Sequence, residues 1–365
     1  MRTLGKTGLK VREIGVGCWA IGGPFINLGL SGGWSGASDK LSKEGLIKAI
    51  ELGANIFDTA DVYGFGHSER LLGWALREAS KVGKQREDFV VVTKTGYSKG
   101  CARHGFDPLH MRHQIEMSLE NLKTDYIDIY FFHHLDFGKD DEYLEGAIGA
   151  METFKNEGKI RFIGLRGPHK FSLYRGKSAG FEGDFEKFKR LQKRVKPDIV
   201  SIRYNMITPT YDEPQKDIFS WAKNKGIGII SYKPLGQGLL LDKYNPENPP
   251  RFGIGDHRIR KAWFENRGLS ILRDRMATIK SHFGIKTTRG MVQLCLKYVL
   301  SRDESVVPVV GFKNKGQIED SLSTSGHLNQ KDVSFIRNAM KGINEEIGAF
   351  TDFDKEGEHA QADIS

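Results

Sequence analysis

The chain has 365 residues, and 55 Lys and Arg stand against 46 Asp and Glu, which gives a formal net charge of +9. The basic residues are interspersed with acidic ones, so the charge indicates a mixed solvated surface and argues against a nucleic-acid-binding protein. No apolar run reaches the roughly 18 residues needed to cross a bilayer, and no signal peptide opens the chain. Together with three widely spaced cysteines, these features predict a cytoplasmic protein that does not enter membranes.

The length permits one domain or two, but no Pro- or Ser-rich linker and no sharp charge boundary divides the chain. Because α/β barrels routinely exceed 200 residues as one unit, we expect a single domain over residues 1–365. Its core covers roughly residues 1–325, and a C-terminal helix and tail follow at 326–365.

The N-terminal segment predicts a hairpin over Arg2–Val11 and a first barrel strand over Glu13–Cys18. A long Gly-rich loop follows at residues 22–36. It lacks a G-x-G-x-x-G pattern between a strand and a helix, so it is not interpreted as a phosphate cradle. A flap over the site and a plain loop both remain open.

Strands and helices then alternate along the chain. Further strands are predicted at Asn55–Asp58, Phe89–Lys94, Ile127–His133, Ile160–Leu165, Ile199–Arg203, Gly228–Lys233 and Ser305–Val310. Helices are predicted at Ser42–Glu51, Ser68–Arg77, Pro108–Leu122, Gly146–Asn156, Phe185–Arg194, Gln215–Asn224, Leu269–Phe283, Thr288–Leu300 and Lys315–Ser323. Eight strands, each followed by a helix, predict an α/β protein with a (β/α)8 TIM barrel, an N-terminal hairpin and long loops at the C-terminal face.

Polar residues stand at or just after the C-terminal ends of three successive predicted strands, the end of a barrel where active sites lie. Asp58, Lys94 and His133 end their strands, and Tyr63 lies on the loop after Asp58. A tyrosine is a useful proton donor near neutral pH if its pKa of roughly 10 is lowered, and an ammonium held by a carboxylate does that. We therefore expect Lys94, held by Asp58, to lower the pKa of Tyr63.

Two groups of histidines allow more than one interpretation. His133 is followed by His134, and because side chains alternate along a strand only one is expected to face the barrel; the spacing from Asp128 favours His133. Ligand-type residues also gather at Cys101, His104, His110 and His113. They straddle a loop and a helix start that the barrel needs anyway, and no second cysteine pair appears, so no metal site is predicted.

The strand-end segments resemble the aldo/keto reductase family, whose tetrad lies in the patterns FDTA..YG, T-K and D-x-Y-x-x-H. Other similar segments are Thr7–Val11, Ser68–Gly73, Gly158–Gly164, Tyr204–Asn205 and Tyr232–Leu240, so the resemblance covers the chain to Ser323. It implies that Asp58, Tyr63, Lys94 and His133 are the catalytic residues and that NADP(H) is the cofactor.

The resemblance also implies how the cofactor is held. Tyr232 stacks on the nicotinamide, Lys243 clamps the pyrophosphate, and Lys313 meets the 2′-phosphate at a helix N-terminus, where backbone N–H groups favour anions. The full set of implied cofactor contacts is Arg166, Ser201, Tyr232, Lys233, Pro234, Leu235, Gly238, Lys243, Gly311, Lys313, Gln317, Asp320 and Ser321. Asp320 and Ser321 replace a usual Glu-Asn pair facing adenine, and Trp19 and His134 are placed in the substrate pocket.

Two positions depart from the family pattern. Arg166-Gly167 stands where Ser-Asn usually holds the nicotinamide carboxamide, and Ser201 replaces a Gln with the same task. We expect Arg166 to enter the barrel mouth and to bind the carboxamide oxygen or an anionic group of the substrate; the alternative is an outward turn toward an acid on a neighbouring loop. The insert at Leu241–Gly268 is either a lid over a bound dinucleotide or a passive surface excursion.

The sequence thus predicts an NADP(H)-dependent carbonyl reductase or alcohol dehydrogenase for a small aldehyde, ketone or sugar-like polyol, with Tyr63 as general acid and base. Two other interpretations stay open: a nucleotide-binding regulatory or scaffold protein on the same barrel, and a redox-assisted dehydratase or epimerase that recycles its nucleotide. The sequence leaves the substrate, the direction of the reaction and the oligomeric state undetermined.

Overall fold

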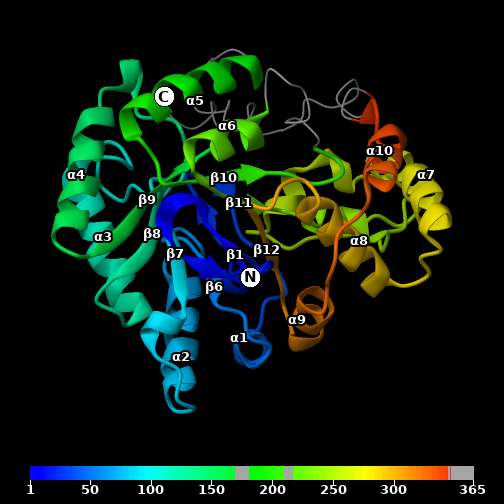
Figure 1. Cartoon of the computed structure of the whole chain (residues 1–365), viewed down its shortest axis with the longest axis horizontal. Helices are drawn as coiled ribbons and strands as arrows, with labels where there is room; N and C mark the ends of the chain where they lie inside the picture. Colours follow the sequence, from blue (N-terminus) through cyan, green and yellow to red (C-terminus); the bar gives the residue numbers. More distant parts are fainter. Residues whose placement is uncertain (169–180, 209–216, 344–345, 347–365) are drawn as a thin grey trace.

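The computed structural model describes residues 1–168, 181–208, 217–343 and residue 346 (Figure 1). Within these ranges, eight parallel strands close into a barrel in the order β10-β11-β12-β3-β6-β7-β8-β9. Their bounds are β3 (Gly15–Gly17), β6 (Ile56–Asp58), β7 (Val90–Thr95), β8 (Ile127–Phe132), β9 (Ile160–Arg166), β10 (Ile199–Arg203), β11 (Gly228–Tyr232) and β12 (Val306–Gly311). The predicted (β/α)8 barrel is confirmed.

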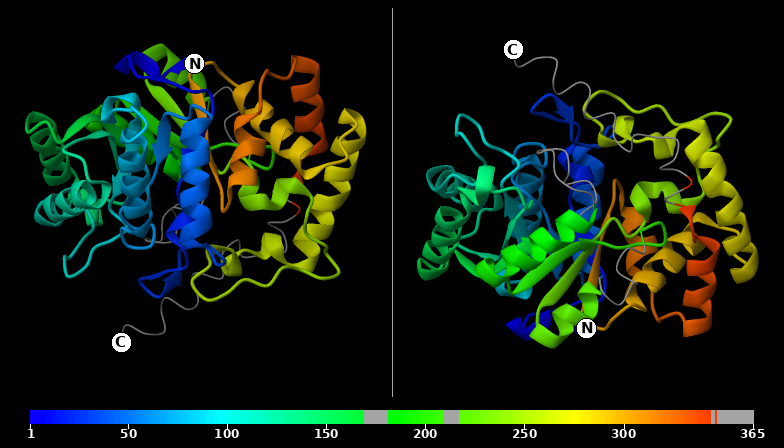
Figure 2. Two further views of the ribbon diagram at one scale, coloured as in Figure 1. Left: turned by 90° about the horizontal axis from the view of Figure 1, so that it is seen from below. Right: turned by 90° about the horizontal axis from the view of Figure 1, so that it is seen from above.

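Helices surround the barrel, as Figures 1 and 2 show from three sides. They are α1 (Asp39–Glu51), α2 (His67–Ser80), α3 (Pro108–Leu122), α4 (Leu144–Asn156), α5 (Phe181–Val195), α6 (Ile218–Lys225), α7 (Asn266–Phe283), α8 (Thr288–Leu300), α9 (Lys315–Leu322) and α10 (Gln330–Ala339). The helices cover the outer face of the strands, so the strands are buried on both faces. This explains why a strand such as β7 is buried along its whole length.

The barrel interior is filled by β-branched and aromatic side chains from alternate strand positions. Ile56, Val92, Ile129 and Phe131 belong to this cluster and are fully buried. An interior filled in this way is a packed core, which leaves binding to the loops at one end.

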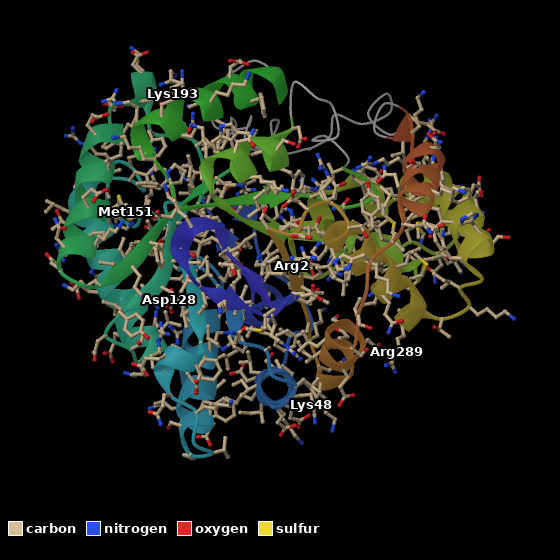
Figure 3. All side chains as sticks on the ribbon, in the orientation of Figure 1. Arg2, Lys48, Asp128, Met151, Lys193 and Arg289 are labelled. Atoms are coloured by element: carbon tan, nitrogen blue, oxygen red, sulfur yellow. The ribbon has the colours of Figure 1, made fainter. Side chains whose placement is uncertain are left out.

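The N-terminal hairpin closes the opposite end of the barrel. Its strands are β1 (Arg2–Thr3) and β2 (Lys10–Val11), joined through the 3-10 turn η1 (Gly5–Thr7), and Leu4 and Leu9 pack into the interior cluster. Arg2, labelled in Figure 3, donates hydrogen bonds to the carbonyl oxygens of Leu300 (3.1 Å), Asp303 (2.6 Å) and Val306 (2.8 Å). The guanidinium therefore fastens the hairpin to the segment that enters β12.

The element boundaries differ from the prediction at a few places. The helix α1 begins three residues before the predicted Ser42. The helix predicted from Gln215 starts outside the described residues, and within them α6 begins at Ile218. The Gly-rich loop contains an unpredicted hairpin of β4 (Ile26–Asn27) and β5 (Leu30–Ser31). Its turn places Leu28 at φ 51° and Gly29 at φ 78°. Because leucine rarely adopts this conformation, the sequence pattern did not predict a turn here.

Within the residues that the structure describes, no helix is both long enough and apolar enough to cross a bilayer.

Candidate active site

The carboxyl ends of the strands open into a cavity of about 760 Å³. All predicted site residues line it: Asp58, Tyr63, Lys94, His133, Trp19, His134, Arg166, Ser201, Tyr232, Lys233, Pro234, Leu235, Gly238, Lys243, Gly311, Lys313, Gln317, Asp320 and Ser321. Its volume lies in the range of small-molecule and cofactor sites. The structure therefore brings together every residue that the sequence assigned to the site, although their individual roles remain predictions.

Asp58 and Lys94 form a buried ion pair at the exits of the neighbouring strands β6 and β7. The Nζ atom of Lys94 lies 2.7 Å from Oδ1 of Asp58 and 2.5 Å from the carbonyl oxygen of Thr59. Burial raises the pKa of Asp58, and the charge and hydrogen bond of Lys94 oppose that rise. The ammonium is thus held in place by two acceptors beneath the cavity.

Tyr63 lies directly above this pair. The Nζ atom of Lys94 is 5.2 Å from the centre of the Tyr63 ring, and the ring of Trp19 stacks on Tyr63 at 6.0 Å. Burial raises the pKa of Tyr63 well above 10, the Asp58 carboxylate adds to the rise, and Arg166 opposes it. The expected net lowering of this pKa is not found, because the burial of the Tyr63 ring, with the Asp58 charge added, outweighs the nearby positive charges. Tyr63 keeps its proton at neutral pH, which is the form that donates.

His133 and His134 both line the cavity, so the expectation that only one faces it is wrong. The strand β8 ends at Phe132, and strand alternation does not extend to the two residues beyond it. His134 Nε2 lies 3.0 Å from the carbonyl oxygen of Gly96. Burial, then Lys94 and Arg166, lower the pKa of His133 well below 6.5, so His133 is neutral at neutral pH. Its ring lies 5.7 Å from that of Tyr63, where a neutral imidazole N–H can meet a carbonyl oxygen.

Arg166 ends β9 and enters the cavity, as expected, while the alternative outward orientation is not found. Its Nη1 donates to the hydroxyl of Tyr97 (2.9 Å) and to the carbonyl oxygen of His133 (3.1 Å), and its Nη2 donates to the hydroxyl of Tyr232 (3.1 Å). Ser201 faces Arg166 in the strand register. The guanidinium therefore positions the Tyr232 ring at the barrel mouth, a task that the sequence did not indicate.

A second group of cations lies beside the N-terminus of α9. Lys313 Nζ donates to the carbonyl oxygen of Ser35 at 2.6 Å, and the Lys313 backbone N–H donates to Gln317 Oε1 at 2.8 Å. Burial and the nearby Arg258 lower the pKa of both Lys243 and Lys313. Lys243 and Lys313 therefore lie close enough to Arg258 to feel its charge, and a cluster of cations beside a helix N-terminus is suited to binding an anion. At the far side of α9, Asp320 lies 3.7 Å from Arg289, which Figure 3 labels.

The Gly-rich loop and the insert are bonded to each other, and residues of both line the cavity. We call residues 22–36 and 252–261 together the clasp; Figure 2 shows the two segments side by side. Gly33 N–H donates to Gly255 O at 2.8 Å, His257 N–H donates to Gly33 O at 2.8 Å, and Asp256 accepts from the Ser35 backbone at 2.8 Å. Arg258 lies over the Trp34 ring at 4.1 Å. These contacts favour the flap and lid interpretations over a plain loop and a passive excursion.

A nicotinamide dinucleotide matches the chemistry of the donors in this cavity. An aromatic ring, Tyr232, lies at the barrel mouth, and Lys243, Arg258 and Lys313 gather near a helix N-terminus, which favours phosphate. The Trp34 Nε1–H is buried without a hydrogen-bond partner in the described part of the chain. The carboxamide of the nicotinamide would meet Arg166 and Ser201, and both can donate hydrogen bonds.

Sequence reasoning missed several residues that line the cavity: Tyr97, Arg203, His257, Arg258, Arg260 and Lys261. Tyr97 follows β7 by two residues, so its place near the strand exits could have been found. Arg203 ends β10 and could have been found in the same way. The insert residues lacked any such signal, because the path of a long insert is set by its tertiary contacts. In the region weighed and rejected as a metal site, His110 Nε2 lies 2.7 Å from Ser98 O, and His104 stacks on Tyr143. Among the described residues, no group of three or more His, Cys, Asp or Glu is placed to hold a metal.

The model of the aldo/keto reductase family matches residues 13–341. L-galactose dehydrogenase of Arabidopsis thaliana is 31% identical over 330 residues, which cover 90% of this chain and 88% of the relative. The NADH-specific methylglyoxal reductase of Escherichia coli is 24% identical over 93% of this chain and 98% of its own length.

Among solved structures, an aldo/keto reductase of Klebsiella pneumoniae in complex with NADP and acetate superposes with a TM-score of 0.58 at 20% identity. The match covers 93% of this chain and 95% of the other, and at this identity it shows a shared fold. The family match spans nearly the whole chain, and the tetrad residues converge in one cavity. The chain therefore belongs to the aldo/keto reductase family.

Proposed function

We propose that this oxidoreductase is an NADP(H)-dependent carbonyl reductase or alcohol dehydrogenase for a small aldehyde, ketone or sugar-like polyol. The observation that carries the proposal is the convergence of Tyr63, the buried Lys94–Asp58 pair and a neutral His133 beside one cavity. A bound nicotinamide supplies or accepts the hydride. The protein has to hold the carbonyl, supply a proton and exclude water.

Tyr63 is the proton donor in this proposal. A tyrosine that stays protonated can give its proton to a carbonyl oxygen as negative charge develops there. The Lys94 ammonium, 5.2 Å from the ring centre, favours the anionic form left behind. His133 orients the oxygen through an imidazole N–H, which is available because burial keeps the ring neutral.

The preference for NADP(H) over NAD(H) rests on Lys313. Its ammonium lies beside the N-terminus of α9 and near Lys243 and Arg258. The 2′-phosphate of NADP(H), which NAD(H) lacks, would be bound there by positive charge. One relative is NADH-specific, so the preference has to be measured for this protein.

The test is turnover by the purified protein, followed by the absorbance of reduced nicotinamide with NADPH and NADH in parallel and a panel of neutral carbonyl compounds. We expect net oxidation with NADPH at a higher kcat/KM than with NADH. Tight nucleotide binding without turnover would favour a regulatory or scaffold protein. Substrate conversion with no net change in nicotinamide would favour a dehydratase or epimerase.

A further inference from the structure

Two positively charged side chains act near Tyr63, and they differ in how their charge is compensated. The Lys94 ammonium is paired with the Asp58 carboxylate at 2.7 Å, so the two together carry no net charge. Arg166 has no carboxylate partner in the part of the chain that the structure describes, and each of its hydrogen bonds goes to a neutral oxygen. Because a guanidinium stays protonated in proteins, Arg166 brings a full positive charge to the cavity.

Arg166 is joined to the surroundings of Tyr63 through a row of rings. Its Nη1 donates to the Tyr97 hydroxyl at 2.9 Å and to the His133 carbonyl oxygen at 3.1 Å. The Tyr97 ring lies 4.6 Å from the His133 ring, and the His133 ring lies 5.7 Å from that of Tyr63. All four residues line the cavity. The guanidinium is therefore held at the same end of the cavity as the proposed proton donor.

The remaining contacts of Arg166 do not neutralise it either. Its Nη2 donates to the Tyr232 hydroxyl at 3.1 Å, and the guanidinium carbon lies 5.1 Å from the centre of that ring. Its Nε–H is buried and has no hydrogen-bond partner within the described residues. A charge acts more strongly in a buried site than in water, because the effective dielectric constant is lower. Arg166 is therefore placed to stabilise a negative charge that forms close by.

Tyr63 is surrounded by charged and titratable groups from several parts of the barrel. They are Asp58 at the end of β6, Lys94 in β7, Tyr97 after β7, His133 after β8, Arg166 at the end of β9 and Tyr232 at the end of β11. Burial raises the pKa of Tyr63 most and the Asp58 charge adds to the rise, whereas Arg166 opposes it. Arg166 thus favours the negatively charged form of Tyr63, which burial disfavours.

Carbonyl reduction creates this charged form. A hydride from the reduced nicotinamide adds to the carbonyl carbon, the O–H bond of Tyr63 breaks, and the proton joins the carbonyl oxygen, so the phenol oxygen keeps a negative charge. Resting on the proposed carbonyl reduction, we propose that Arg166 is a positioning residue that acts through Tyr63: its positive charge stabilises the phenolate that remains after the proton has moved. Lys94 shares this task, but its own charge is paired with Asp58.

The first experiment measures the ionisation of residue 63 without turnover. 3,5-Difluorotyrosine is incorporated at position 63, because its phenol ionises at a lower pH than that of tyrosine and its 19F signal shifts on ionisation. In Arg166→Met the midpoint of this titration should rise by about one pH unit or more, since a nearby opposite charge lowers the pKa of an acid by about that amount. Arg166→Lys keeps the charge and should restore most of the original midpoint.

Two further variants separate charge from packing. Arg166→Gln is neutral but retains an amide that donates hydrogen bonds, so its midpoint should rise as in Arg166→Met, and it replaces that variant if Arg166→Met does not fold. Arg251→Met is the control, since Arg251 is an exposed cation that does not line the cavity, and it should leave the midpoint unchanged.

The second experiment tests the charge during turnover. Arg166→Ala should lower kcat about tenfold or more, because one pKa unit and a tenfold rate change correspond to the same free energy. Guanidinium ion, at concentrations that do not unfold the protein, should restore activity to this variant. Urea has a similar shape and no charge, so it should not. Fluorescence titration of each variant ensures that NADPH is saturating, so that a weaker cofactor affinity does not enter the comparison.

Two results would overturn the proposal. An unchanged 19F midpoint in both Arg166→Met and Arg166→Gln would show that the guanidinium does not act on Tyr63; a weaker NADPH affinity in the same variants would then assign Arg166 to the cofactor alone. Equal effects of guanidinium and urea on Arg166→Ala would show that shape, and not charge, is what the variant lacks. If the wild type reduces no carbonyl compound, the proposed function is wrong, and the 19F titration still decides whether Arg166 stabilises the anion of Tyr63.

Discussion

The ammonium of Lys94 and the carboxylate of Asp58 lie 2.7 Å apart, and these residues are only 5% and 6% exposed. The charge and hydrogen bond of Lys94 therefore oppose the rise that burial causes in the pKa of Asp58. The pair also fixes Lys94 beneath Tyr63, so it links the stability of the barrel to the proposed chemistry.

Replacing Lys94 by Met should destabilise the protein by about 3–5 kcal/mol, because a buried carboxylate loses its partner. The double variant Asp58→Asn with Lys94→Met should recover much of that loss, since it leaves no charge unpaired. Urea unfolding of the wild type, both single variants and the double variant measures the coupling. Additive effects would show that the two groups are independent.

Tyr63→Phe should lower kcat by about 10²- to 10⁴-fold, the usual contribution of a positioned general acid. The affinity for NADPH should change little, because the hydroxyl is needed only as the carbonyl oxygen gains charge. Steady-state kinetics and fluorescence titration of NADPH separate the two effects. Unchanged turnover together with weaker cofactor binding would exclude Tyr63 as the proton donor.

Lys313→Ala should weaken NADPH binding by roughly 1.5–3 kcal/mol and NADH binding far less, since only NADPH carries a 2′-phosphate. Lys315→Ala is the control, because Lys315 is an exposed cation two residues away that does not line the cavity. Dissociation constants for both nucleotides decide the matter. Equal weakening for NADPH and NADH would show that Lys313 does not bind the 2′-phosphate.

Asp61 should make the folded state less stable as pH rises. Burial raises its pKa to about 7 from 3.8, although Gln114 donates to Oδ2 at 2.8 Å. The folded protein therefore binds a proton more tightly than the unfolded chain, and the stability that this proton contributes is lost between about pH 4 and pH 7.

The check is the free energy of unfolding of the wild type minus that of Asp61→Asn, measured in urea from pH 4.5 to pH 7.5. The difference should fall by an amount on the order of a few kcal/mol over this window. Taking the difference cancels the contribution of Asp58, whose pKa burial also raises. A constant difference would mean that Asp61 is ionised throughout.

The strand-end residues of the site could be predicted from the sequence because each is fixed by local pattern. Asp58 ends a short apolar strand, and Lys94 lies one residue from the end of another, so the closure of the barrel alone brings them together. The pKa of Tyr63 could not be predicted, because it depends first on how completely the folded protein buries the ring. That burial is a result of three-dimensional packing and has no local sequence pattern.

The clasp could not be predicted from the sequence for a different reason. The bonds between Gly33 and Gly255 and between His257 and Gly33 join segments that are more than two hundred residues apart in the chain. Neither segment has a periodic sequence pattern from which its contact with the other could be predicted. Tyr97 and Arg166 likewise meet through their side-chain tips, so their contact follows from rotamers and not from strand phase.

The clasp has a consequence for the lifetime of a complex. Backbone hydrogen bonds of Gly33 tie the loop to the insert in the wall of the cavity. If the two segments enclose a bound dinucleotide, it would leave no faster than those bonds open. Opening is a unimolecular event whose rate is set by the protein and not by the concentration of nucleotide outside. We therefore expect residence time and affinity to be governed by separate parts of this molecule: the clasp sets the first, and the cations near α9 set the second.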